Sequence, residues 1–229
     1  MAPVAVISDV HANLEALEAV LEQVRGMELY CLGDLVDYGA SPNEVVERVR
    51  RGAKLVVMGN HDLAAITGDT SLFNARAAIS SKWTSKTLTV DSRDYLSKLP
   101  RDWKSKVATA SVYFAHGSPD DQLWEYVDPS THHYLFGHYL TKLGVGLMGL
   151  GHTHIPYVWR GQEGVVFNPG SVGQPRDGDP RASWAVVTAQ GETVDVEIRR
   201  VEYNVVAAAS RIRKAGLPES HAERLSKGI

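Results

Sequence analysis

Three short hydrophobic runs in the first 60 residues predict buried strands. They cover residues 3–8, 29–32 and 54–58, and each gives way to a polar turn. Uninterrupted apolar runs of this length, without polar alternation, are typical of strands in a parallel sheet.

Two segments with helical spacing separate these runs. The first is predicted to begin after Asn13, a good N-cap residue, and to end at Gly26, with apolar residues every three or four positions between them. The second begins at Ser41-Pro42-Asn43-Glu44, which combines a capping serine, a first-turn proline and an early glutamate, and ends at Gly52. The strand–helix–strand–helix–strand order predicts a parallel sheet.

The rest of the chain changes in character. Residues 62–100 are predicted to be mainly helical, with breaks near Gly68 and Ser92, whereas the aromatic-rich residues 120–142 carry no clear pattern. Further strands are predicted at 112–115, 145–150, 156–160, 164–167, 182–188 and 192–199, and a last helix at 203–215. The short connections in this half favour hairpins, and we expect one domain over residues 1–229 with two sheets.

Composition excludes several classes of function. The 229 residues are 44% hydrophobic and carry a net charge of −3 without a long basic run, so duplex nucleic acid is not an expected partner. No stretch has the length of a membrane span, and no signal peptide is evident, so the cytoplasm is the expected compartment and a membrane is not an expected partner. Cys31, the only cysteine, lies in an apolar run and is expected to be a buried thiol.

Polar residues with metal-binding side chains follow the predicted strands. Each stands in a turn containing or bordering Gly, Ser or Asn, and the set is Asp9, His11, Asp34, Asn60, His116, His152 and His154. Ligand sites of open α/β sheets collect where strands end, so these residues are expected to meet. Their carboxylate, imidazole and amide groups suit Mn²⁺, Fe or Zn²⁺ better than Ca²⁺. Seven ligands are natural for two metal ions about 4 Å apart, with one carboxylate shared.

The order of these blocks resembles the calcineurin-like metallophosphoesterase superfamily. The blocks are Asp9-x-His11, Gly33-Asp34-x-x-Asp37, Gly59-Asn60-His61-Asp62, His116, and Gly151-His152-x-His154, and Asn168-Pro169-Gly170-Ser171 looks like a loop of the bacterial members. The resemblance implies an α/β fold, a four-layer αββα sandwich of two mixed β-sheets flanked by helices. It also implies two divalent metal ions; Mn²⁺ is favoured, with Fe, Zn, Co or Ni as alternatives.

The resemblance implies a role for each matching residue. Asp9, His11 and His154 would bind the first metal, while Asn60, His116 and His152 would bind the second. Asp34 would bridge the two ions, and a metal-bridging hydroxide would attack phosphorus in line. His61 would protonate the leaving oxygen with Asp62 orienting it, and Asp37 would accept a hydrogen bond from a ligand histidine.

Departures from the family pattern limit the classes of substrate that we expect. Ser/Thr protein phosphatases carry Arg after the second motif and Glu after the third-motif His, where this chain has Tyr38 and Asp62. Arg176 or Arg181 are candidates to replace that arginine. The chain looks more like the small bacterial phosphodiesterases, so we expect hydrolysis of a small phosphodiester, with a cyclic nucleotide as one candidate.

Two alternatives to a phosphodiesterase are compatible with the sequence. One is a phosphomonoesterase, including phosphoprotein or dinucleoside polyphosphate hydrolysis; the other is a non-catalytic binding scaffold, because a eukaryotic cargo-sorting subunit resembles the same superfamily. The complete ligand set disfavours the scaffold. Trp124 and Tyr126 are candidates for an apolar platform or for core packing, and we expect surface or structural roles for the remaining histidines, His132, His133, His138 and His221.

Overall fold

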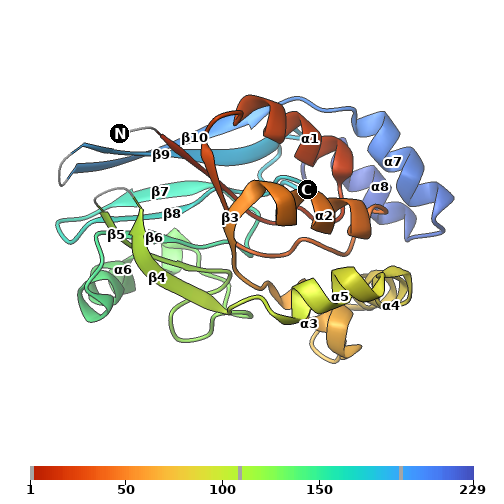
Figure 1. The fold of residues 1–229 in the computed structure, drawn as a ribbon, viewed down its shortest axis with the longest axis horizontal. Coiled ribbons are helices and arrows are strands. Elements are labelled where there is room, and N and C mark those ends of the chain that lie inside the picture. Colours follow the sequence, from red (N-terminus) through yellow and green to blue (C-terminus); the bar gives the residue numbers. More distant parts are fainter. Residues whose placement is uncertain (1–2, 108–109, 191–192) are drawn as a thin grey trace.

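Two five-stranded sheets form the centre of the computed structural model, which describes residues 3–107, 110–190 and 193–229 (Figure 1). The first sheet has the order β10-β9-β1-β2-β3, made of β1 (Val4–Ile7), β2 (Glu28–Cys31), β3 (Ala53–Val56), β9 (Ala182–Gln190) and β10 (Thr193–Val201). The second has the order β4-β5-β6-β8-β7, made of β4 (Asp102–Val107), β5 (Ala110–Ala115), β6 (Leu147–Gly149), β7 (Tyr157–Arg160) and β8 (Val165–Asn168).

The predicted parallel unit is confirmed. β1 pairs in parallel with β2, and β2 with β3, through the crossover helices α1 (Leu14–Gln23) and α2 (Pro42–Gly52). Asn13 caps α1 by accepting a hydrogen bond from the Ala16 amide, whereas Ser41 precedes α2 without a side-chain cap. Antiparallel β9 extends this sheet beyond β1, so the sheet is mixed.

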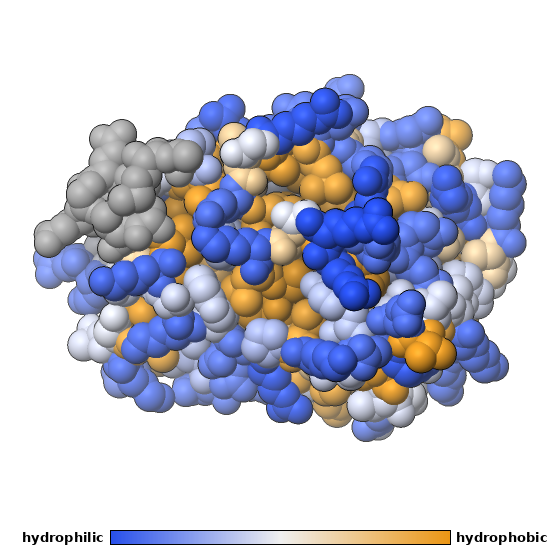
Figure 2. Space-filling model, in the orientation of Figure 1, coloured by the Kyte–Doolittle hydropathy of each residue, from blue (hydrophilic) through white to orange (hydrophobic). Residues whose placement is uncertain are grey.

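The two sheets pack face to face and are covered by helices on their outer faces. Between them, Val6, Tyr30 and Leu32 of the first sheet and its flanking turn pack with Phe114 and Phe167 of the second. α1 and α2 cover the outer face of the first sheet, and α6 (Pro129–Leu143) covers the outer face of the second. The expected four-layer αββα sandwich is therefore confirmed. On the face drawn in Figure 2, exposed hydrophobic residues are visible mainly toward the middle of the molecule.

Three helices follow β3, as expected for residues 62–100. They are α3 (Asn60–Thr67), α4 (Ala75–Thr87) and α5 (Val90–Ser97). The break at Gly68 is confirmed, since this residue ends α3 with a left-handed φ of 78°. The predicted break near Ser92 is wrong: Ser92 is buried within α5, and the chain turns at Leu88 and Thr89, where the Thr89 hydroxyl caps α5.

Other differences arise where local pattern carries little information. The edge strand β4 was not predicted because most of its side chains are exposed and polar, and α6 lies in the segment without a clear pattern. The hairpins β7–β8 and β9–β10 agree with the prediction, but β6 pairs in parallel with β8 rather than with β7.

The C-terminal region contains two helices, α7 (Val205–Lys214) and α8 (Glu219–Leu225). The first agrees with the predicted final helix, and the second was not predicted. Among the described residues, no helix is long and apolar enough to cross a membrane.

Phe136 tests how far α6 stabilises the second sheet. Its side chain is fully buried against that sheet, while Tyr134 on the same helix is 70% exposed. We expect Phe136→Ala to lower the free energy of unfolding by about 3–5 kcal/mol, because it removes buried apolar surface and leaves a cavity. Tyr134→Ala is the matched control, and urea unfolding followed by circular dichroism measures both; equal effects would contradict this packing.

Candidate metal centre

The seven predicted ligand residues come together where the two sheets meet at the carboxyl ends of their strands. Asp9 and His11 follow β1, Asp34 follows β2, and Asn60 begins α3 directly after the turn that leaves β3. From the second sheet, His116 follows β5, and His152 and His154 follow β6. All seven side chains belong to buried residues, so their polar atoms depend on one another or on a ligand rather than on bulk water.

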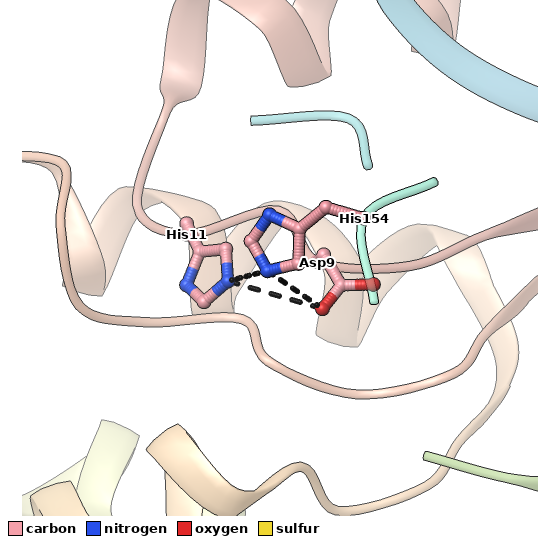
Figure 3. Close-up of side chains that lie close together, drawn as sticks. All are labelled: Asp9, His11 and His154. Atoms are coloured by element: carbon pink, nitrogen blue, oxygen red, sulfur yellow. Dashed lines mark hydrogen bonds and ion pairs between the residues drawn. The ribbon is translucent and has the colours of Figure 1, made fainter. Parts of the chain in front are cut away.

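Asp9, His11 and His154 form the first cluster (Figure 3). The Nε2 atoms of His11 and His154 are 3.1 Å apart. Asp9 Oδ1 lies 3.3 Å from His154 Nε2 and 3.9 Å from His11 Nε2. Three donor atoms from segments far apart in the sequence thus face a common point.

Asp34, His116 and His152 form the second cluster, with one ligand atom from each lying within 4.8 Å of the others. Asn60 joins it, because its Oδ1 is 3.1 Å from His116 Nε2. Asp34 Oδ2 lies between the clusters, 3.2 Å from His116 Nε2 and 3.6 Å from His11 Nε2. This position is the one that a bridging carboxylate needs.

Backbone carbonyls orient three of the histidines. The Nδ1 atoms of His11, His116 and His154 lie 2.9, 2.8 and 2.6 Å from the carbonyl oxygens of Val36, Leu32 and Gln174 respectively. In a neutral ring, donation from Nδ1 leaves the lone pair on Nε2, and all three Nε2 atoms point into the centre. The short contact between His11 and His154 then brings two lone pairs together, which is unfavourable unless a cation or a proton lies between them.

The remaining ligands show the same need for a positive partner. Asp9 Oδ1 and Asp34 Oδ2 are buried carboxylate oxygens without a hydrogen-bond partner. Such atoms are costly in a protein interior. The donor set and these two oxygens therefore fit two divalent metal ions.

The protonation tendencies of the site follow from burial and its charges. Burial lowers the pKa of His11 and of His154 well below the usual value, which favours the neutral, ligating form. Burial also lowers the pKa of His116, but the Asp34 carboxylate more than offsets this and raises it to about 9. Burial raises the pKa of Asp9 to about 6. Metal ions would compete with protons at His116 and Asp9.

The backbone of the ligand turns is strained. Positive φ angles occur at Asp9, His11, Asp34, His152 and His154, with values from 48° to 67°. Side chains other than glycine seldom adopt this left-handed conformation, and it concentrates at functional sites. Gly59 is needed for a different reason: a Cβ at this position would collide with the backbone nitrogen and carboxylate of Asp34.

His61 lies beside the centre, and Asp37 orients it. The ring of His61 is 5.0 Å from the ring of His11, and its Nδ1 is 2.8 Å from Asp37 Oδ2. Burial lowers the pKa of His61, but the Asp34 charge and the Asp37 hydrogen bond outweigh this, so the net shift is upward. The protonated ring is thereby favoured.

The prediction that Asp62 orients His61 is wrong. The Asp62 carboxylate accepts hydrogen bonds from the amides of Asp34, Leu35 and Gly59 at 3.0, 2.9 and 3.0 Å. It therefore fixes the turn that carries Asp34. Asp37 likewise accepts from His61 rather than from one of the predicted ligand histidines.

Aromatic residues surround the centre. Tyr126 stacks on His152 with ring centroids 3.8 Å apart, and the Trp124 carbonyl lies 3.2 Å from His152 Nε2. Phe73 stacks on His61 at 4.4 Å and contacts the Trp124 ring at 5.5 Å. Trp124 and Tyr126, candidates for a platform or for core packing, thus both contact the site. Phe73 also contacts it, and no sequence motif pointed to this residue.

Of the two candidate arginines, Arg176 lies beside the site and Arg181 does not. The Arg176 amide donates to the His154 carbonyl at 3.3 Å, and its guanidinium lies 5.9 Å from the centroid of the Tyr38 ring. Arg181 is paired with Asp179 at 2.7 Å. The loop at residues 168–171 supports the centre, because the Ser171 hydroxyl donates to the Asp9 carbonyl at 2.7 Å.

Known proteins are similar to this chain in sequence or in fold. The uncharacterised protein MJ0912 of Methanocaldococcus jannaschii is 39% identical, with 98% of each chain covered. A metallophosphoesterase from Sphaerobacter thermophilus is 37% identical with a TM-score of 0.85, and both chains are covered completely. Hypothetical protein PH1004 from Pyrococcus horikoshii shares the fold at 24% identity and a TM-score of 0.88, with 100% of this chain and 99% of that one covered.

The profile of the calcineurin-like phosphoesterase superfamily domain matches residues 3–192. This range contains both histidine–carboxylate clusters and His61. The chain is therefore a member of the calcineurin-like phosphoesterase superfamily and a metal-dependent phosphoric ester hydrolase.

Proposed function

We propose that the protein is a dinuclear phosphodiesterase that hydrolyses a small phosphodiester, with a cyclic nucleotide as a candidate and Mn²⁺ as the preferred ion. The observation that supports this most directly is Asp34 Oδ2, a buried carboxylate oxygen that has no hydrogen-bond partner and lies within 3.6 Å of a histidine from each cluster. Divalent metal ions bound there would supply activated water and stabilise charge on the phosphoryl oxygens.

The protein's own groups would provide the proton for the leaving oxygen. His61 is the candidate general acid, because it lies next to the centre and its environment favours the charged ring. Asp37 acts through His61 as a positioning residue, fixing the Nδ1 proton and leaving Nε2 to face the substrate. The stack of Phe73 on His61 limits rotation of the ring.

The diester assignment is supported by Tyr38, which stands where phosphatases of the Ser/Thr class carry an arginine. Its ring packs against His11 at 4.6 Å and His61 at 4.7 Å, so it contributes no charge to the scissile phosphate. A diester has one negative charge fewer than a fully ionised monoester and needs fewer cationic partners. The nearby Arg176 is the observation that favours the alternative, a phosphomonoesterase.

A substrate panel tests the proposal. Purified protein would be supplied in turn with Mn²⁺, Fe²⁺, Co²⁺ and Zn²⁺, and given bis-p-nitrophenyl phosphate, p-nitrophenyl phosphate and cyclic nucleotides. We expect kcat/KM to be larger for the diesters and largest with Mn²⁺. Preference for the monoester would support the alternative, and no diester turnover with any of the metals would remove the diesterase assignment.

Metal content distinguishes the bridging role of Asp34 from the role of His61. We expect two metal ions per chain in the wild type, loss of at least one in Asp34→Asn, and two retained in His61→Ala with most of the rate lost. The amide of Asn lacks the charge that would hold two cations together. Elemental analysis after gel filtration measures this, and two ions in Asp34→Asn would contradict the bridging assignment.

The leaving group tests proton donation by His61. We expect His61→Gln to lower kcat by about 100-fold or more for an alkyl leaving group, which needs a proton, and much less for p-nitrophenolate, which does not. Asp37→Asn should also lower kcat more for the alkyl leaving group than for p-nitrophenolate, but by a smaller factor than His61→Gln. Asp94→Asn is the control, since Asp94 is exposed and paired with Lys98.

Equal losses on both leaving groups would show that His61 serves binding rather than proton transfer. If Asp37→Asn lost activity without any leaving-group dependence, its role would be structural. These outcomes leave the metal assignment intact.

A further inference from the structure

A cleft of about 440 Å³ adjoins the metal centre. Its lining brings together α4, α8, the loop between β2 and α2, and two loops of the second half of the chain. It includes Tyr38, Arg76, Tyr126, Arg176, His221 and Arg224. Both helices lie on the helix-rich side of the molecule (Figure 1). Both helices are segments that supply no ligand to the metal centre, whereas the loops of the lining adjoin it.

The charge of this cleft is one-sided. Three arginines line it, and none of its lining residues is acidic. Among the described residues, no aspartate or glutamate side chain forms an ion pair with Arg76, Arg176 or Arg224. Several arginines elsewhere on the protein are paired with carboxylates, for example Arg181 with Asp179 and Arg213 with Glu219.

Two buried nitrogen atoms at the cleft also have no hydrogen-bond partner. They are Arg176 Nε and His221 Nδ1, and His221 is only 1% exposed. Arg224 donates through Nε to the Ile229 oxygen at 2.5 Å. The pKa of Arg224 is lowered, first by burial and then by the neighbouring charge of Arg176.

The cleft is continuous with the metal centre through shared residues. Tyr38 lines the cleft and contacts the ring of His11, while Tyr126 lines it and stacks on His152. Arg176 follows the segment whose Gln174 carbonyl orients His154. A molecule whose scissile phosphate lies at the metals would extend past these two tyrosines toward the arginines.

We propose that this arginine cleft binds a second phosphate group of the substrate, separate from the phosphate that is hydrolysed. Guanidinium groups without carboxylate partners are the side chains best suited to phosphate oxygens. The N-terminus of α4, where Arg76 lies, adds favourable potential for an anion. The inference rests on the proposed function for the place of the scissile group, and it narrows the substrate to phosphoesters with an additional phosphate.

Binding to the metal-loaded protein tests the second-phosphate site without requiring turnover. The probes are adenosine 3′,5′-bisphosphate and adenosine 5′-monophosphate, which differ by one phosphate, and calorimetry gives the Kd of each. We expect the bisphosphate to bind at least about tenfold more tightly, the scale of one charge-assisted contact. Arg76→Gln and Arg176→Gln should each bring the ratio of the two Kd values toward one.

Arg181→Gln is the matched control and should leave the ratio unchanged, because Arg181 is paired with Asp179 outside the cleft. Arg76 is exposed on α4, so its substitution should preserve the fold even if Arg176→Gln does not. Equal affinity of the wild type for both probes, or an unchanged ratio in Arg76→Gln and Arg176→Gln, would overturn the inference. A preserved ratio in a protein without hydrolytic activity would instead contradict only the proposed function.

Discussion

The structure depends on a cluster of buried electron-pair donors that require positive charge between them. Nε2 atoms of histidines held by backbone carbonyls face each other and face two carboxylate oxygens without hydrogen-bond partners, on Asp9 and Asp34. In a protein interior such an arrangement is unfavourable without a positive charge at its middle. Two divalent ions would turn these repulsions into coordination bonds, and the surrounding fold can then be understood as the means of holding the donors in place.

The two sheets serve this purpose directly. Each ends its central parallel strands at the same edge, so turns after β1 and β2 meet turns after β5 and β6. Carboxylates that bind no metal stabilise these turns: Asp62 accepts three amides around Asp34, and Asp37 positions His61. The metal centre, the acid and the arginine cleft thus occupy one continuous region, although their residues span most of the chain.

Features of the fold that depend on neighbouring residues could be predicted from the sequence, whereas those that depend on contacts between distant segments could not. The strands of the first sheet, the Asn13 cap and the set of ligand-type residues follow from runs, spacing and motifs. The pairing of β6 with β8 depends on contacts between distant segments, and the exposed lysines of β4 hide an edge strand, since charged side chains are common there. The role of Asp62 was predicted wrongly because it is adjacent to His61 in sequence, whereas Asp37, 24 residues away, is the carboxylate that reaches the His61 ring. The sequence identified Arg176 as a candidate arginine but did not predict its position beside the metal centre, because its neighbours in the cleft come from four separate segments.

The left-handed turns also restrict which amino acids can replace the ligand residues during evolution. Asp, Asn and His tolerate positive φ better than most residues, and they are also good metal ligands. At Asp9, His11, Asp34, His152 and His154 a replacement must satisfy the backbone and the ion together. Glutamate or cysteine would supply a donor atom but fit the turn poorly. The residue types that can serve as metal ligands at these positions are therefore limited by backbone conformation as much as by coordination chemistry.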